Sequence, residues 1–315
     1  MNKLRIDSMT NDMVFFSENR SKRPIDKCRY DKDINSSYEE KRECPFCIGN
    51  ENICGEETFR LEDRDGWLVK SVKNKFPILD EISHEINGVH EVMVDTYRHD
   101  GSFYDMSTFE FENLFTMYKD RYINLSKDNK IMYISIFKNF LRQAGASLNH
   151  PHSQIVSLPL IPPELEKELS IGKDYYEKNR KCLYENIIEE EINLNKRVIH
   201  NSKNFLVIVP SATKYTGEVR ILFKEKIKFE DLKEIDIKEL AKIFKILFEN
   251  IEKVEGDMPF NLCIHTYPTN IKSRKYFNTH MHIIPRKYSF GGFELGTGMY
   301  VSSKKPEDLA LKLKF

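Results

Sequence analysis

The sequence His150-Pro151-His152-Ser153-Gln154 lies near the middle of the 315-residue chain, and a second His-x-His segment, His280-Met281-His282, lies near its end. Side chains at positions i and i+2 of a strand point to the same face. We therefore expect His150, His152 and Gln154 to line one side of a strand. Each His-x-His segment closes a similar run of predicted elements, which indicates an internal repeat.

The stretches on either side of these segments follow one order in both halves of the chain. Apolar, β-branched stretches predict strands at 67–72, 91–94 and 131–136, and again at 205–209, 217–222 and 260–264. Apolar residues at three- and four-residue steps predict helices over 106–125 and 229–254. Antiparallel domains can share such an order by chance, but the matched His-x-His endings favour a repeat.

The repeat predicts the fold class and the domain organisation. We expect an α+β protein of two tandem domains, each an antiparallel sheet with packed helices. The proline-rich segment 158–163 and the charged helical run that follows it to about residue 181 separate the two halves. The domains are accordingly placed at residues 1–170 and 171–315.

The composition limits the partners of the protein. Lys+Arg and Asp+Glu are balanced at 49 each, so no global charge attracts nucleic acid or an anionic membrane. The chain has no signal-peptide core and no run of about eighteen apolar residues. We expect a cytoplasmic protein that binds neither partner. In a reducing compartment its six cysteines are metal-ligand candidates before they are disulfide partners.

The pair Cys44-x-x-Cys47 has the spacing with which one tight turn offers two thiolates to a tetrahedral zinc ion. A lone pair of this kind can also be two small buried residues or a redox site. A zinc site needs two further ligands, and the spacing alone does not choose among the candidates. These are Cys54, His84, His90, His99 and His150.

The central His-x-His segment has the chemistry of nucleotidyl transfer. A neutral imidazole attacks phosphorus well when one ring nitrogen donates to a carbonyl and the other keeps its lone pair. His152 is the predicted nucleophile, and the Gln154 amide can donate to the phosphate oxygen on which charge develops. Most lone His-x-His pairs are ordinary histidines. The small polar stretch 145–149 and the basic residues Arg20 and Arg23 favour a phosphate site here.

At these residues the chain resembles the galactose-1-phosphate uridylyltransferase family, a branch of the histidine triad superfamily with two tandem copies of that fold. The likeness spans nearly the whole chain. The segments that carry it are Leu4-Arg5-x-Asp7, Arg20-Ser-Lys-Arg23-Pro24, Cys44-Pro-Phe-Cys47, Asn74-Lys-Phe-Pro77, Gly88-Val-His-Glu-Val92, His99, Asn139, Ser147, His150-Pro-His-Ser-Gln154, His280-Met-His282 and Gly292-Phe-Glu-Leu-Gly-Thr-Gly298.

The resemblance implies a role for each matching residue. His152 is the nucleotidylated nucleophile and Gln154 is its oxyanion partner. Zinc is held by Cys44, Cys47, His99 and His150. The residues that contact the substrates are Arg20, Arg23, Asn74, Asn139, Ser147, Glu294, His280 and His282. The resemblance also implies a homodimer and, as substrates, a nucleoside diphosphate sugar and a sugar-1-phosphate or phosphate.

One departure from the family pattern concerns the metals. Relatives with a second zinc site carry Cys-x-x-Cys and a histidine in the second half, where this chain has Cys182-Leu-Tyr-Glu185 and Lys226, so that zinc is expected to be lost. Other relatives hold a second metal with a glutamate and the later histidines. Glu168, His280 and His282 are the matching residues here.

Three functions fit these features. The first is UDP-glucose:hexose-1-phosphate uridylyltransferase activity by double displacement through a nucleotidyl-histidine. The second, suggested by the segment Gly292–Gly298, is an enzyme like ADP-glucose phosphorylase, with inorganic phosphate as the acceptor. The third is a non-catalytic zinc-containing nucleotide-binding protein, suggested by the altered second zinc site.

Overall fold

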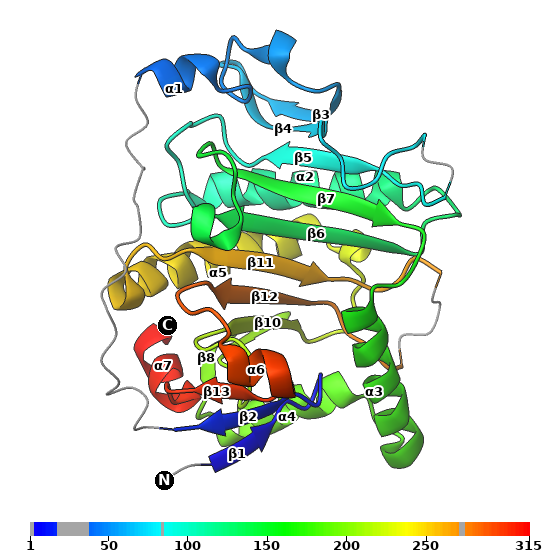
Figure 1. The fold of residues 1–315 in the computed structure, drawn as a ribbon, viewed down its shortest axis with the longest axis vertical. Coiled ribbons are helices and arrows are strands. Elements are labelled where there is room, and N and C mark those ends of the chain that lie inside the picture. The colour runs from blue at the N-terminus through cyan, green and yellow to red at the C-terminus, as the bar shows by residue number, and fades with distance from the viewer. Residues whose placement is uncertain (1–2, 18–37, 83–84, 271–274) are drawn as a thin grey trace.

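A ten-stranded antiparallel sheet forms the centre of the molecule (Figure 1). The computed structural model describes residues 3–17, 38–82, 85–270 and 275–315, so Arg20, Arg23 and His84 lie outside the described residues. The strand order is β3-β4-β5-β7-β6-β11-β12-β10-β9-β8. The strands of the first half are β3 (Glu57–Glu62), β4 (Trp67–Lys73), β5 (His90–Val94), β6 (Tyr133–Phe140) and β7 (His152–Leu158). Those of the second half are β8 (Val198–Asn201), β9 (Phe205–Ile208), β10 (Val219–Phe223), β11 (Phe260–His265) and β12 (His280–Pro285).

The two halves repeat one topology. In each, three strands form a meander, a long helix follows, and two more strands return with the last one placed next to the third. The helices are α2 (Thr108–Leu125) and α5 (Glu234–Glu255). The halves join where β6 pairs with β11, with Asn139 opposite Asn261. The predicted α+β repeat fold is therefore confirmed, and its two sheets are one continuous sheet.

The remaining elements surround this sheet. A small sheet contains β1 (Lys3–Ile6), β2 (Met13–Phe16) and β13 (Tyr300–Ser302). The other helices are α1 (Tyr38–Glu43), α3 (Pro163–Asn179), α4 (Leu183–Leu194), α6 (Gly292–Thr297) and α7 (Pro306–Leu313), and the short 3-10 turns are η2 (Glu51–Ile53), η3 (Arg142–Ala144) and η4 (Phe229–Asp231). The boundary predicted at residue 170 lies inside α3. No helix in the described part of the chain is long and apolar enough to cross a membrane.

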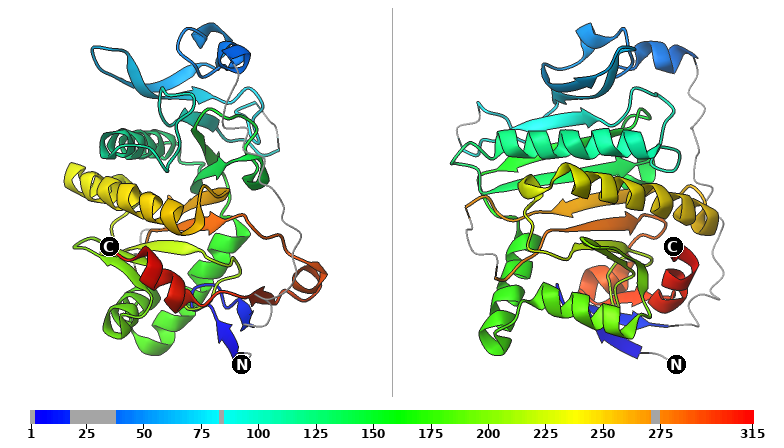
Figure 2. Two further views of the ribbon diagram at one scale, coloured as in Figure 1. Left: turned by 90° about the vertical axis from the view of Figure 1, so that its left-hand side faces the viewer. Right: turned by 180° about the vertical axis from the view of Figure 1, so that it is seen from behind.

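The two long helices lie side by side on one face of the sheet (Figure 2). α2 begins at a capping box, in which Ser107 and Glu110 satisfy each other's backbone N–H groups. Its Phe115 ring packs 4.8 Å from the Phe244 ring of α5. The residues of this face belong to one large buried core, to which both halves contribute.

The strand register separates this core from a polar face. Residues that pair across antiparallel strands point to the same side of the sheet. One row across five strands is apolar and buried against the helices: Ile155, Ile136, Ile264, Met281 and Ile221. The neighbouring row points to the opposite side: Gln154, Phe137, Cys263, His282 and Arg220. Both His-x-His segments therefore contribute side chains to the face of the sheet that α2 and α5 do not cover.

Two predicted elements need correction. The helix expected over 229–254 is a 3-10 turn, Phe229–Asp231, followed by α5 from Glu234. His150 was expected in the catalytic strand, but β7 begins at His152. Pro151 has no N–H to donate to a sheet ladder, which places His150 in the turn before the strand.

Candidate active site

His152 is the first residue of β7 and is 6% exposed. Its Nδ1 lies 2.9 Å from the carbonyl oxygen of His150. A carbonyl only accepts, so Nδ1 carries the proton and Nε2 keeps its lone pair. Burial, reinforced by the Lys138 ammonium, lowers the pKa of His152. The imidazole is therefore neutral at neutral pH and has the tautomer of a phosphorus nucleophile.

A buried ion pair supports the backbone of this histidine. The Lys138 ammonium of β6 donates to the Asp95 carboxylate at 2.6 Å and to the His152 carbonyl oxygen at 3.0 Å. Both charged side chains are buried, and the ammonium also lies over the Phe103 ring. The Asp95 N–H donates to the Pro151 carbonyl at 3.0 Å. The pair thus fixes the chain on both sides of the point where β7 begins.

Gln154 lies two residues further along the same face of β7. Its Oε1 is 2.9 Å from Nε2 of His90, a buried residue of β5. Asn74, which follows β4, places its amide nitrogen 3.3 and 3.2 Å from the two ring nitrogens of His90. The predicted substrate ligand Asn74 and the predicted oxyanion partner Gln154 therefore meet at one imidazole, which had been considered only as a metal ligand.

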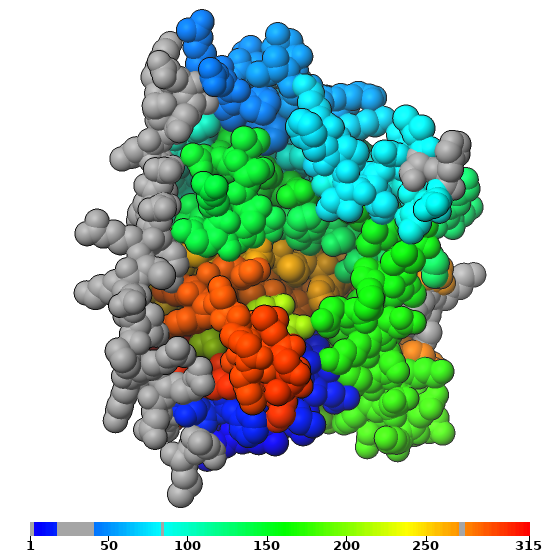
Figure 3. All heavy atoms as spheres, viewed as in Figure 1, coloured from blue at the N-terminus to red at the C-terminus, as the bar shows by residue number. Residues whose placement is uncertain are grey.

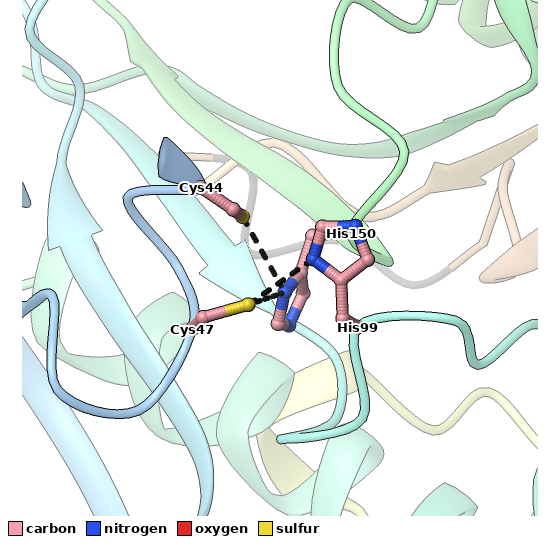
Figure 4. Close-up of side chains that lie close together, drawn as sticks. All are labelled: Cys44, Cys47, His99 and His150. Carbon is pink, nitrogen blue, oxygen red and sulfur yellow. Dashed lines mark hydrogen bonds between the residues drawn. The ribbon is translucent and has the colours of Figure 1, made fainter. Parts of the chain in front are cut away.

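Cys44, Cys47, His99 and His150 converge on one point, as Figure 4 shows, and their ligand atoms all lie within 4.8 Å of one another. The Cys44 and Cys47 sulfurs lie 3.7 and 3.6 Å from His150 Nδ1, and the Cys47 sulfur lies 3.1 Å from His99 Nδ1. Zinc bonds of about 2.3 Å to sulfur and about 2.0–2.1 Å to nitrogen, at tetrahedral angles, separate such ligands by about 3.6 Å. The group has the composition and spacing of a zinc site.

A hydrogen bond and the burial of this group both favour metal binding. His150 Nε2 donates to the Thr96 carbonyl at 2.9 Å, which leaves Nδ1 as the ligand atom. Burial and the neighbouring Cys44 raise the pKa of Cys47, so a cation is needed to hold two thiolates here. The rival candidate Cys54 packs beside the group without belonging to it.

A second group could also hold a metal: Glu168, His265, His280 and His282, again with all ligand atoms within 4.8 Å. Glu168 comes from α3, His265 from β11, and the other two from β12. The helix approaches closely because Gly172 has no side chain, and an added Cβ would lie 2.0 Å from the Tyr276 carbonyl oxygen. The predicted trio therefore comes together and gains His265.

The hydrogen bonds of this second group leave nitrogen lone pairs for a cation. Nδ1 of His280 donates to the Asn278 carbonyl at 2.8 Å, and Nδ1 of His282 lies 2.6 Å from the Glu218 carboxylate. Burial holds the pKa of His282 well below its usual value. Among the described residues, its buried Nε2 has no hydrogen-bond partner. Three imidazoles and one carboxylate suit a divalent transition metal.

Two residues at the position where the resemblance implies a second zinc site form an ion pair. Glu185 of α4 lies 3.0 Å from the Lys226 ammonium. Cys182, the residue before the helix, has its sulfur 3.8 Å from the Asn278 side-chain oxygen. The carboxylate and the ammonium stand where the resemblance implies a thiolate and an imidazole.

The elements that carry the other described substrate-contact candidates, namely β6, the β6–β7 connection and α6, border a hollow on the polar face (Figure 3). Asn139 accepts from Asn261 at 2.7 Å and stands beside the loop that carries Ser147, which is exposed. Glu294 caps its own short helix by accepting from the Gly291 N–H. Figures 2 and 3 show α6 on the side opposite α2 and α5, at the lower edge of the hollow. In the part of the chain that the structure describes, no hydrogen bond or ion pair joins Glu294 to either group of metal-ligand candidates.

Four residues of the site were not assigned their positions from the sequence. His265 joins the second metal group and His90 contacts Gln154. Asn261 donates to Asn139 and accepts from Arg286 at 2.8 Å. The one local signal for His265 is that this polar residue directly follows the predicted strand 260–264. Nothing in the local sequence shows that β11 lies next to β12.

Family models match both halves of the chain. The model described as galactose-1-phosphate uridyl transferase, C-terminal domain, matches residues 168–307. The model described as domain of unknown function (DUF4931) N-terminal domain matches residues 29–161. The two matched ranges meet close to the proline-rich segment between the halves.

Similar proteins cover the chain from end to end. ADP-glucose phosphorylase of Arabidopsis thaliana is 33% identical over 98% of this chain and 91% of its own length. Galactose-1-phosphate uridylyltransferase of Thermotoga maritima is 29% identical over 100% of this chain and 98% of its own. The crystal structure of the Arabidopsis phosphorylase with bound ADP-glucose has a TM-score of 0.87, with 31% identity, 100% of this chain covered and 99% of the other.

Proposed function

We propose that this chain, which belongs to the galactose-1-phosphate uridylyltransferase family together with ADP-glucose phosphorylase, transfers a nucleoside monophosphate through a covalent intermediate on His152. The observation that carries the proposal is the buried, neutral His152 ring, whose Nδ1 proton is held by the His150 carbonyl. Its free Nε2 lone pair faces the same side of the sheet as Gln154.

The reaction takes two displacements. His152 Nε2 attacks the α-phosphorus of a nucleoside diphosphate sugar, a nitrogen–phosphorus bond forms, and the bond to the leaving sugar-1-phosphate oxygen breaks. An oxygen of the second phosphate then attacks the same phosphorus, an oxygen–phosphorus bond forms, the nitrogen–phosphorus bond breaks, and the neutral imidazole of His152 leaves. The Gln154 amide donates to the non-bridging oxygen on which charge develops. Asn139 and Ser147 border the phosphates, and Glu294, His280 and His282 stand on the side of the acceptor.

Both metal-ligand groups belong to the proposal. Cys44, Cys47, His99 and His150 would hold a structural zinc ion, because four protein ligands leave no position for a reacting water. The group of Glu168, His265, His280 and His282 would hold a second divalent metal. The ions would stabilise the fold around the site, and no step of the transfer passes through them.

The first candidate reaction is uridylyl transfer from UDP-glucose to a hexose-1-phosphate. It is supported by the C-terminal family match and by the Thermotoga relative. The second candidate uses ADP-glucose and inorganic phosphate, and it is supported by the Arabidopsis relative and its structure. We further propose that the protein acts in the cytoplasm as a homodimer, in which Arg20 and Arg23 help to bind the substrate phosphates.

The test is covalent labelling with nucleotide sugars that carry a radioactive α-phosphate. The protein is incubated with UDP-glucose or ADP-glucose, and the label is expected to be acid-labile and absent from the variant His152→Asn. Release of glucose-1-phosphate is then measured with galactose-1-phosphate or inorganic phosphate as acceptor. Strict use of UDP-glucose with a hexose phosphate supports the first reaction, and phosphorolysis of ADP-glucose supports the second. Absence of label from both donors would refute the proposal and favour a non-catalytic nucleotide-binding protein.

A further inference from the structure

The protonation of His90 follows from the groups around its ring. The backbone N–H of Ile78 lies 3.0 Å from His90 Nδ1 and can only donate. Nδ1 is therefore an acceptor, and in a neutral imidazole the proton must then be on Nε2. Burial lowers the pKa of His90, which keeps the ring neutral at neutral pH. The Asn74 amide nitrogen is held beside the ring because its side-chain oxygen accepts from the Phe76 N–H at 2.9 Å.

The protonated Nε2 of His90 determines how the Gln154 amide is oriented. The ring donates to its partner at 2.9 Å, and that partner must be the side-chain oxygen of Gln154. The oxygen and the NH2 group lie on opposite sides of a carboxamide. The NH2 group of Gln154 is thus turned away from His90. A flipped amide would place two N–H donors against the Nε2 proton and would turn its oxygen toward the anionic phosphate.

We infer that His90 is a positioning residue for nucleotidyl transfer: through the chain Ile78 N–H, His90, Gln154, it holds the Gln154 amide with its donors toward the reacting phosphate. The inference rests on the proposed function. The sequence left His90 open as a candidate metal ligand, but the described cysteine–histidine group does not include this residue. The strand register supports it, because Val92 pairs with Gln154 and Val94 pairs with His152, which places His90 on the same sheet face.

The experiment compares rates of single-turnover labelling of His152 by the donor that labels the wild-type protein. The variant His90→Phe keeps an aromatic ring and removes both nitrogens. We expect it to slow labelling by about tenfold to a hundredfold, less than or equal to the loss on removing an oxyanion donor, while the Kd of the nucleotide sugar changes less than threefold. The variant His90→Gln restores an N–H donor, and we expect it to recover at least half of the loss on a logarithmic scale.

A double variant of His90 and Gln154 distinguishes a positioning role from a general loss of structure. If His90 acts through Gln154, adding His90→Phe to Gln154→Ala slows labelling less than twofold further. The matched control is His200→Phe on β8, a remote histidine that contacts the Phe315 carbonyl, and it should label at the wild-type rate. Circular dichroism and metal content are recorded for every variant.

The outcomes distinguish this inference from the proposed function. A wild-type protein that takes no label refutes the proposed function itself. A labelled wild type with an unchanged His90→Phe rate, or with losses that multiply in the double variant, overturns the role of His90 alone. If His90→Phe does not fold, the variant His90→Leu, which also removes both ring nitrogens, takes its place. Its rate alone and in combination with Gln154→Ala decides the question by the same two criteria.

Discussion

The histidines of the site have different chemistry because their neighbours assign their protons. His152 donates from Nδ1 to a backbone carbonyl, which leaves the Nε2 lone pair free. His150 donates from Nε2 to the Thr96 carbonyl, which leaves the Nδ1 lone pair free. The Ile78 N–H sets the proton of His90 in the opposite way, by donating to its ring. Residue type alone therefore identifies the site, and the hydrogen-bond partner identifies the role.

Lys138 provides a prediction at the residue scale. Replacing Lys138 by Met leaves the Asp95 carboxylate buried without its cation, which is expected to lower the free energy of unfolding by about 3–5 kcal/mol. The double variant Lys138→Met/Asp95→Leu removes both charges, and it should be more stable than the single variant. Urea unfolding measures both. A single variant as stable as the wild type would show that the pair carries no stabilising interaction.

At the scale of elements, the cysteine–histidine group connects three segments distant in sequence. Cys44 and Cys47 lie on the turn after α1, His99 lies beyond the end of β5, and His150 precedes β7. The proposed nucleophile, His152, is only two residues from His150, a member of this group. A metal at this group would therefore fix the position at which the catalytic strand begins, in addition to stabilising the fold.

The cysteines offer a matched pair of variants at this scale. Cys47→Ser removes a converging ligand, and we expect loss of about one zinc per chain, a decrease of more than about 2 kcal/mol in the free energy of unfolding, and slower labelling of His152. Cys54→Ser changes a thiol that lies beside the group and should keep both the metal and the rate. Elemental analysis and urea unfolding test the pair. Equal metal loss in both variants would assign Cys54 a ligand role.

At the scale of the whole molecule, the two repeats share a sheet and a core. β6 and β11 pair across the junction, and aromatic rings of α2 and α5 pack together on one face. Neither half closes its core alone. The hollow on the other face, between the β6–β7 connection and α6 (Figure 3), is likewise lined by both halves.

This shared core predicts cooperative unfolding. Trp67 is the only tryptophan and lies in the first half, whereas circular dichroism at 222 nm detects helices of both halves. For the metal-loaded protein, the two signals are expected to follow one urea transition with the same midpoint. A Trp67 transition that is complete before half of the helical signal is lost would instead show that the first repeat unfolds independently.

The sequence was sufficient for the parts of the structure that depend on local pattern. The strands around Trp67, Phe205 and Phe260, the two long helices and the order of the repeat follow from periodicity and spacing. The members of the cysteine–histidine group were obtained from the resemblance, since spacing alone did not choose among Cys54, His84, His90, His99 and His150. The junction of β6 with β11 and the contribution of His265 depend on pairing between distant strands, which local pattern does not contain. The role of His90 depends on single hydrogen bonds.

The two His-x-His segments show what duplication within one chain allows. In the first repeat, His150 belongs to the cysteine–histidine group and His152 is the proposed nucleophile, whereas in the second both His280 and His282 join one group with Glu168. In the second segment, Nδ1 of each histidine has a hydrogen-bond partner, the Asn278 carbonyl for His280 and the Glu218 carboxylate for His282, and both rings belong to that group. A protein that assembled from two identical copies could not have separated these roles, because every mutation would have changed both segments at once.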